Sequence, residues 1–292
     1  MKVIRIGTRA SKLAMIQAEL VAKAIEGTFP QIKTRLIPMI TTGDRILDRT
    51  LDQIGGKGLF VKELDAALLE GRVDITVHSC KDLPMELDER LPVVAVSRRE
   101  DPRDVLVLPM GAGEWDPSKS VGCSSARRRI QLTRLHPGIQ VEPVRGNVLT
   151  RLEKLDRGEY GALVLAAAGL RRLGLEGRIS HLFSPGEMLP AAGQGILAVQ
   201  ARQGEDTSYV KRFHSPESLW CMLAERAFVR RLDGGCSKPC AAYAVVEQGQ
   251  ILLRGMYVSE DESTVVHGRV TCLPQQGEAQ GAALAERMKH RG

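Results

Sequence analysis

Aromatic residues are scarce in this sequence, since Phe, Trp and Tyr make up only 4% of its 292 residues. Proteins that bind single-stranded nucleic acids stack bases on aromatic side chains, often beside arginines. No aromatic residue alternates with the arginines here, so the net charge of +6 does not indicate a nucleic-acid surface. We therefore expect no nucleic-acid partner.

The sequence also lacks an apolar run of about 18 residues, which a membrane-spanning helix requires. Its N-terminus enters a strand pattern at residues 2–6, without the apolar segment of a secretory signal. The six cysteines form no CxxC pair and have no neighbouring histidine doublet, so their spacing indicates neither a zinc site nor a disulfide framework. These absences predict a protein of the reducing cytoplasm, with no membrane partner and no metal.

Strand and helix patterns alternate along most of the chain, which predicts an α/β protein. The predicted strands are 2–8, 32–39, 73–77, 91–97, 105–109, 120–123, 139–144, 162–165, 196–201, 241–247, 250–258 and 264–272. A first helix is predicted to begin after Ser11. The other predicted helices are 59–70, 125–135, 147–157, a segment near 219–228 and a last one around 278–289. Residues 41–58 are rich in glycine and predict a long loop, and no internal repeat is visible.

A chain of this length exceeds one comfortable core, so we expect two or three domains. Polar stretches at 98–104 and 190–195 indicate two crossings between α/β units, with a cleft between the resulting lobes. From about Ser215 the pattern changes to that of a small α+β domain. The predicted domains are residues 1–98 with 196–214, residues 103–190, and residues 216–292.

The most informative segment is a short apolar strand, 73–77, that leads into Lys81 and Asp82. Ligands bind at strand ends in open α/β sheets, so Asp82 is a candidate catalytic acid. Nearby cations favour its charged form and burial disfavours it, and such a group can stabilise a cationic intermediate or move protons. A helix cap or surface ion pair explains these two residues about equally well, and His78 is more typical of a core.

Cationic clusters follow other predicted strands as well: Arg9 with Ser11, Arg127 and Arg128 after Ser124 and Ser125, and Arg145 with Gly146 and Arg151. Arginine binds carboxylates in a bidentate manner, and free N–H groups at helix starts attract anions. A solvated basic helix face would explain each cluster alone. Together they predict a pocket for a small polyanion.

Two glycine-rich segments leave alternatives open. The loop with Lys57 and Phe60 lacks the P-loop spacing, so either a mobile lid or a plain flexible loop fits it. Cys236 follows two glycines, which would let its thiol approach another surface, and Lys238 would favour the thiolate. A small buried hydrophobe is the ordinary alternative for a free cysteine.

In combination and order, these motifs resemble the porphobilinogen deaminase (hydroxymethylbilane synthase) family over nearly the whole chain. The segments that carry the resemblance are Gly7–Ser11, Gly55–Phe60, His78–Pro84, Arg99–Asp104, Ser124–Arg128, Arg145–Val148, Leu165–Leu170, Gly193–Gly195 and Gly234–Cys236. The resemblance implies two periplasmic-binding-protein-like lobes around a cleft, with a small three-stranded α+β domain at the C-terminus.

The resemblance also implies a transferase of tetrapyrrole (haem-type) biosynthesis. Such an enzyme joins four porphobilinogen molecules head to tail with loss of ammonia and releases hydroxymethylbilane. It does so on a dipyrromethane cofactor held by a thioether, here on Cys236. Asp82 matches the family's catalytic aspartate, which would hold pyrrole N–H groups and offset the positive charge left by ammonia loss. A monomer is expected.

The remaining implied residues follow from the carboxylates that every pyrrole carries. For the cofactor they are Cys236, Lys81, Ser79, Ser125, Arg127, Arg128, Arg145, Gly146 and Asp82. For the substrate they are Arg9, Ser11, Arg145, Arg151, Arg172 and Gln194, and Lys57 and Phe60 would belong to a mobile loop. Ser124 would add a hydrogen bond.

Three features depart from the family pattern: Cys123 replaces a threonine, Lys238 replaces an apolar residue, and the last helix is short. A non-catalytic protein that grips a polycarboxylate between the same two lobes is the alternative from another functional class. The presence of both Asp82 and Cys236 favours the enzyme.

Overall fold

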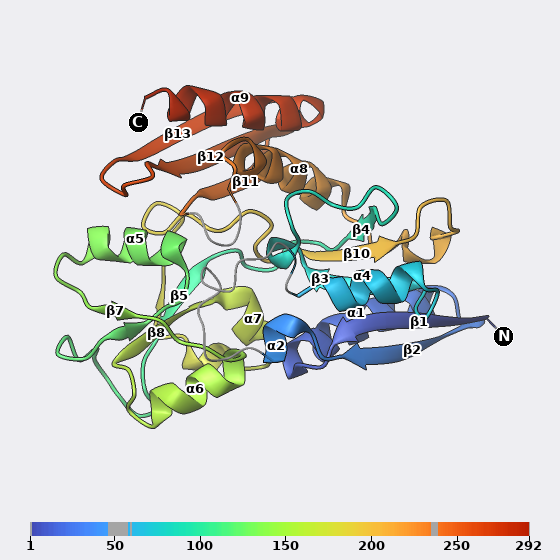
Figure 1. The fold of residues 1–292 in the computed structure, drawn as a ribbon, viewed down its shortest axis with the longest axis horizontal. Coiled ribbons are helices and arrows are strands. Elements are labelled where there is room, and N and C mark those ends of the chain that lie inside the picture. The colour runs from blue at the N-terminus through green and yellow to red at the C-terminus, as the bar shows by residue number, and fades with distance from the viewer. Residues whose placement is uncertain (1, 46–57, 59, 235–238, 292) are drawn as a thin grey trace.

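The computed structural model describes residues 2–45, 58, 60–234 and 239–291. Its strands form two five-stranded sheets and one three-stranded sheet. The two larger sheets belong to two lobes that lie side by side, and the third sheet lies with two helices across the top of both in the view of Figure 1.

The first lobe is built on a sheet with the strand order β2-β1-β3-β10-β4. Its strands are β1 (Lys2–Arg9), β2 (Ile32–Met39), β3 (Ile75–Ser79), β4 (Val93–Val96) and β10 (Leu197–Ala201). Its helices are α1 (Lys12–Thr28), the short α2 (Thr42–Arg45) and α4 (Lys62–Leu69). α1 begins where the Ser11 hydroxyl accepts a hydrogen bond from the Ala14 N–H, and its apolar face, with Val21 and Ile25, is fully buried on the sheet.

The second lobe has a sheet with the order β7-β6-β8-β5-β9. Its strands are β5 (Asp104–Val107), β6 (Val121–Gly122), β7 (Val141–Glu142), β8 (Ala162–Ala166) and β9 (His181–Leu182). Its helices are α5 (Ala126–Leu135), α6 (Val148–Asp156) and α7 (Ala167–Arg172). The main buried cluster of this lobe packs Leu152 and Leu155 of α6 against Leu163 and Leu165 of β8.

The two sheets repeat one topology, although no repeat is visible in the sequence. In the first sheet, β10 lies between β3 and β4 and runs antiparallel to both. In the second sheet, β5 lies in the same way between β8 and β9. β10 and β5 are each the first strand after the chain has crossed from the other lobe, at 97–103 (the first crossing) or 190–196 (the second crossing).

The C-terminal part is an antiparallel sheet with the order β11-β12-β13, backed by two helices. The elements are α8 (Pro216–Arg231), β11 (Ala241–Glu247), β12 (Gln250–Val258), β13 (Val265–Cys272) and α9 (Gly277–Lys289). Phe228 of α8 and Leu284 of α9 pack onto Ile251 and Leu253 of the central strand. Single 3₁₀ turns complete the described chain at Cys80–Asp82, Glu176–Arg178, Ser208–Val210 and Pro274–Gln276.

The expected fold class is confirmed: two α/β lobes with a small three-stranded α+β part. Among the described residues, two α-helices and one strand were not predicted. α2 lies inside the segment expected to be a loop, and α7 and β9 follow β8, where no element was expected. Within the described ranges, no helix combines the length and apolar character needed to span a bilayer.

Candidate active site

Lys81 and Asp82 lie at the C-terminal end of β3, where the strand turns sharply. The four residues of β3 before Ser79 are buried, and the chain then enters the 3₁₀ turn Cys80–Asp82. The Cys80 N–H donates to the Ile196 carbonyl at 2.9 Å, which ties this turn to the second crossing. We call residues 80–85 the Lys-Asp turn. Its position at the strand end is the one that the sequence pattern indicates.

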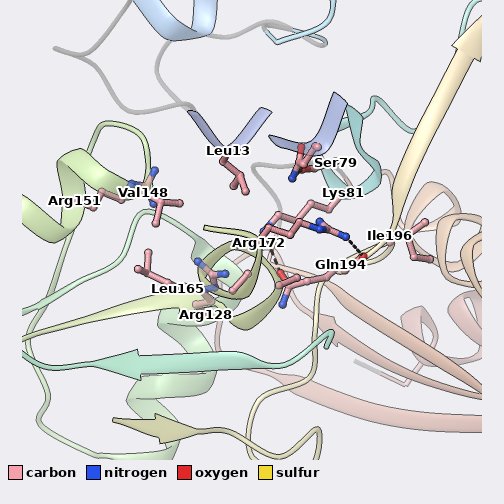
Figure 2. Close-up of a pocket in the computed structure, with 16 residues that line it drawn as sticks. Leu13, Ser79, Lys81, Arg128, Val148, Arg151, Leu165, Arg172, Gln194 and Ile196 are labelled. Carbon is pink, nitrogen blue, oxygen red and sulfur yellow. Dashed lines mark hydrogen bonds between the residues drawn. The ribbon is translucent and has the colours of Figure 1, made fainter. Parts of the chain in front are cut away.

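A cavity of about 110 Å³ opens between the two lobes beside this turn. It is lined by Leu13, Gln17, Ser79, Lys81, Arg128, Val148, Arg151, Leu165, Ala166, Ala168, Gly169, Arg172 and residues 193–196. Figure 2 shows how its cations reach it from different elements: Lys81 from the Lys-Asp turn, Arg128 from α5, Arg151 from α6 and Arg172 from α7. None of the described residues that line it is acidic.

Burial lowers the pKa of three of these four cations. Burial, followed by the charge of Arg128, lowers the pKa of Lys81 to about 8 and that of Arg151 to about 10. Burial also lowers the pKa of Arg172 to about 10. An anion placed between them would reverse these shifts, because it would favour the charged forms. The cavity therefore suits a ligand with several carboxylates.

Asp104, at the start of β5, organises two of the predicted arginines. It is fully buried and accepts hydrogen bonds from Arg127 Nη1 at 2.7 Å and Arg128 Nε at 2.9 Å. Burial alone would raise the pKa of this carboxyl, but the two guanidiniums overcome that effect and hold the pKa well below its ordinary value. Arg127 also donates to the Leu189 carbonyl and does not line the cavity, whereas Arg128 does.

Gln194 connects the Lys-Asp turn to Asp104. Its Oε1 accepts from Lys81 Nζ at 3.2 Å, while its Nε2 donates to Asp104 Oδ1 at 2.9 Å and to the Pro102 carbonyl at 2.6 Å. Gln194 is almost fully buried. The predicted Lys81, Arg128 and Gln194 thus belong to one network, and Asp104 is the member that sequence reasoning missed.

Other residues that were predicted to bind the cofactor or substrate instead contact other parts of the protein. Arg9 forms an ion pair with Asp44 and lies over the ring of Phe60, 4.2 Å from its centroid. Ser11 caps α1, and the Ser124 hydroxyl bonds the backbone of Val144. None of these side chains lines the described cavity.

Of the two remaining predicted serines, Ser79 lines the cavity and Ser125 does not. The Ser79 hydroxyl is 3.0 Å from Nε2 and 3.2 Å from Oε1 of Gln17, and both residues line the cavity. Ser125 precedes α5, and its side chain makes no capping bond. Its carbonyl accepts a hydrogen bond from the thiol of Cys123, the residue that departs from the family pattern.

Arg145 and Gly146 precede α6. The backbone of Gly146 has φ = 111°, which favours glycine, and its carbonyl accepts a hydrogen bond from Arg151 Nε at 2.8 Å. The charge of Arg145 contributes to the lowered pKa of Arg151. This group therefore fixes the position of one cavity cation.

The Asp82 carboxylate is half-buried, and no hydrogen bond joins it to another described side chain. Its charge partly offsets the lowering of the pKa of Lys81 and Arg151 and contributes to the raised pKa of Arg128. It is thus an acceptor at the edge of a cationic cavity. Lys57, Cys236 and Lys238 lie outside the described residues.

Comparison with known proteins identifies the family. Residues 4–210 match the family model described as porphobilinogen deaminase, dipyromethane cofactor binding domain. Residues 219–290 match porphobilinogen deaminase, C-terminal domain. The chain belongs to the porphobilinogen deaminase family. The resemblance seen in the sequence motifs is thereby confirmed.

Curated relatives agree over nearly the whole length. The chain is 57% identical over 285 residues to the porphobilinogen deaminase of Acetivibrio thermocellus, covering 98% of this chain and 97% of that protein. It is 58% identical over 287 residues to that of Alkaliphilus oremlandii, covering 98% and 96%. Among solved structures, the periplasmic aliphatic sulphonate binding protein of Escherichia coli has a TM-score of 0.40 at 14% identity, covering 78% of this chain and 72% of that one. A structural similarity this weak supports no conclusion about function.

Membership of the porphobilinogen deaminase family confirms the expected activity and cofactor. The chain is a transferase that joins porphobilinogen units on a dipyrromethane primer and forms hydroxymethylbilane for tetrapyrrole biosynthesis. The chemistry of the cavity suits such a group, because its partly buried cations match the acetate and propionate carboxylates of pyrroles. The alternative hypothesis, a non-catalytic protein that binds a polycarboxylate, is therefore rejected.

Proposed function

We propose that the cavity between the lobes is where the dipyrromethane cofactor and porphobilinogen are held, with Asp82 as the catalytic carboxylate. The observation that carries this proposal is the meeting of Lys81, Arg128, Arg151 and Arg172 in a cavity without an acidic lining residue, beside one half-buried aspartate. When bound, the dipyrromethane supplies the free pyrrole carbon to which substrate units are added.

The cationic side chains would divide the carboxylates between them. For the cofactor we propose Lys81, Ser79, Ser125, Arg127, Arg128, Arg145 and Gly146, with Cys236 as the covalent attachment point. For the substrate we propose Arg9, Ser11, Arg145, Arg151, Arg172 and Gln194, and for the loop over the site Lys57 and Phe60. Arg127 would act through Asp104, which it shares with Arg128.

Asp82 would hold pyrrole N–H groups and offset the positive charge that develops as ammonia leaves the substrate. Its surroundings support this role, because Lys81 and Arg128 lie within electrostatic range of the Asp82 carboxylate. No described side chain donates a hydrogen bond to its oxygens, which leaves them open to pyrrole N–H groups. Lys81 and the arginines would fix both pyrroles by their carboxylates, which supplies the proximity that bond formation requires.

At the scale of the whole chain, we propose domains of 1–98 with 196–214, 103–190 and 216–292, the last of which carries the cofactor cysteine. We also propose that the enzyme works as a monomer in the cytoplasm. The family's substrate is a small diacid amine, and the cavity gives no reason to invoke a nucleic acid.

The test of the active-site assignment is Asp82→Asn, compared with Asp88→Asn in the exposed Asp88–Arg90 pair of the same loop. We expect Asp82→Asn to keep its cofactor and lose about 100-fold or more in turnover of porphobilinogen, because charge stabilisation is lost while the shape stays. The control variant should turn over substrate normally. Near-normal activity of Asp82→Asn would remove it from this role.

The attachment point is tested by the intact mass of the denatured protein, followed by peptide mapping. We expect an added mass of two linked pyrroles on the peptide that contains Cys236. Cys236→Ser should give an unmodified chain. An adduct retained in that variant would assign the thioether to another thiol, such as that of Cys240.

A further inference from the structure

Arg226 of α8 reaches out of the C-terminal part to hold the Lys-Asp turn. Its side chain is about nine-tenths buried, and Nη2 donates to the carbonyls of Pro84 at 2.5 Å and Met85 at 3.1 Å. These carbonyls come two and three positions after Asp82. A single guanidinium thus satisfies both acceptors, and burial lowers its own pKa.

The residue before it on α8, Glu225, holds the second crossing. Glu225 is fully buried, accepts from the Gly193 N–H at 2.7 Å, and receives Arg99 Nη2 of the first crossing at 2.7 and 2.8 Å. Gly193 precedes Gln194, the partner of Lys81. Consecutive residues of one helix therefore hold the Lys-Asp turn, through Arg226, and the crossing that carries the partner of Lys81, through Glu225.

Cys80 is the first residue of the Lys-Asp turn and contacts the second crossing. Its side chain is fully buried, and a Cβ placed on Gly193 would lie only 2.6 Å from the Cys80 sulfur. Leu83 of the turn packs in the same buried cluster as Met222 of α8. The turn is thus held against α8 both by the apolar contact of Leu83 and by the Arg226 hydrogen bonds to the residues that follow it.

We propose that Arg226 is a positioning residue for Asp82. By fixing the carbonyls of Pro84 and Met85, the Arg226 guanidinium sets the path of the Lys-Asp turn. It thereby sets the direction in which the Asp82 carboxylate points. The inference rests on the proposed role of Asp82. It places a determinant of catalysis outside both lobes, on α8, the helix that precedes Cys236 in the sequence.

The kinetic test compares Arg226→Met and Arg226→Lys with Arg230→Met as the matched control. Arg230 lies one turn further along α8 and forms an exposed pair with Glu278. We expect Arg226→Met to lower kcat by about 10- to 100-fold with KM within about twofold of wild type, because a displaced catalytic group costs rate rather than binding. Arg226→Lys should recover part of the loss, and Arg230→Met should behave as wild type.

Alkylation of Cys80 in the native protein, followed by peptide mapping, reports the turn directly. Burial raises the pKa of this thiol to about 11, and the nearby Arg226 charge opposes the rise. Removal of that charge alone would make the thiol less reactive, since alkylation requires the thiolate. Faster labelling by iodoacetamide in Arg226→Met can therefore come only from an opened turn, and we expect it there but not in Arg230→Met.

Unchanged kcat in Arg226→Met, or a fall in kcat with Cys80 still protected, would overturn the proposal. If Arg226→Met does not fold or carries no cofactor by intact mass, Arg226→Lys decides by the same two measurements. Asp82→Asn separates this inference from the proposed function, because it should lose turnover with Cys80 still protected. An active Asp82→Asn beside an inactive, labelled Arg226→Met would keep the positioned turn but reject Asp82 as the group that is positioned.

Discussion

Asp104 shows how one buried carboxylate can prepare a site for anions. Two guanidiniums and an amide converge on it, so it organises Arg127, Arg128 and Gln194 without lining the cavity. A buried charge of this kind is tolerated only when its partners are complete. Of the cations that face the cavity, Arg128 is thereby fixed directly and Lys81 through Gln194, before any ligand arrives.

Replacing this carboxylate should be costly. We expect Asp104→Asn to lower the free energy of unfolding by about 3–5 kcal/mol, because two buried guanidiniums lose their counter-charge. Thermal unfolding monitored by circular dichroism measures the change. Asp206→Asn, in an exposed pair with Lys2, is the control and should stay within about 0.5 kcal/mol of wild type. Equal stability of the two variants would contradict the assigned role of Asp104.

Asp65 of α4 predicts a pH dependence of stability. Burial, and then the charge of Asp88, raises its pKa to about 6, and its Oδ1 has no hydrogen-bond partner among the described residues. Between about pH 4 and pH 6 the folded state holds a proton that the unfolded state releases, so this group makes stability fall as the pH rises through that window.

Asp65→Asn should remove this effect. We expect a gain on the order of 1 kcal/mol at pH 7, discounted for partial solvent screening, and a rise in Tm of about 2–4 °C. The difference in Tm between variant and wild type should shrink as the pH falls from 6 to 4. A difference independent of pH would show that the Asp65 carboxylate does not titrate in this range.

At single positions, the sequence reveals the site only in part. Lys81 and Asp82 are detectable because a buried strand ends just before them, which is a local signal. Asp104, Glu225 and Arg226 are not detectable, because their partners lie far away in the sequence and only the tertiary fold brings them together. Arg127 and Arg128 are neighbours on one helix, and their division between Asp104 and the cavity likewise depends on the packed fold.

At the scale of the elements, periodic patterns predict most of the fold. β2, β11 and β12 have the bounds that strand patterns indicate, because their apolar residues alternate or lie in short runs. α7 was missed since its sequence, with two alanines and a glycine before Leu170, has no amphipathic face to detect. Yet α7 carries Arg172 into the cavity, where it donates to the Gly195 carbonyl.

The second crossing predicts a measurable cost of substitution. Gly195 has φ = 87°, and a Cβ there would lie 2.2 Å from the Glu100 carbonyl of the first crossing. Gly204 has a similar φ of 82° with no atom within 4 Å, so it isolates the backbone strain. We expect Gly204→Ala to cost about 1–2 kcal/mol of stability. Gly195→Ala should cost clearly more, because the crossings must also separate, and equal losses in thermal unfolding would contradict the close contact.

At the scale of the whole molecule, the cavity is small for the reaction. Its volume of about 110 Å³ lies below the roughly 300–1,000 Å³ of ordinary small-molecule pockets. A product of four linked pyrroles needs more room than this. We therefore expect the lobes to move apart as units are added, with the bending at the two crossings that join them.

Small-angle scattering tests this movement. A compact chain of this length has a radius of gyration of about 19 Å, and we expect it to increase stepwise as one, two and three equivalents of porphobilinogen are added to the loaded enzyme. Intact mass of the same samples counts the units bound. An unchanged radius in a sample that carries three added units would show that the room is made without separation of the lobes.

The return of the chain to the first lobe with β10 also has a consequence for synthesis on the ribosome. β10 lies between β3 and β4 in the first sheet, so that sheet stays split until residues 197–201 have been translated. All strands of the second lobe, β5 to β9, have been translated by then, because they lie in one continuous segment. The nascent second lobe can thus close before the first, and β3, which leads into Lys81 and Asp82, gains its last neighbour only after both lobes have been translated.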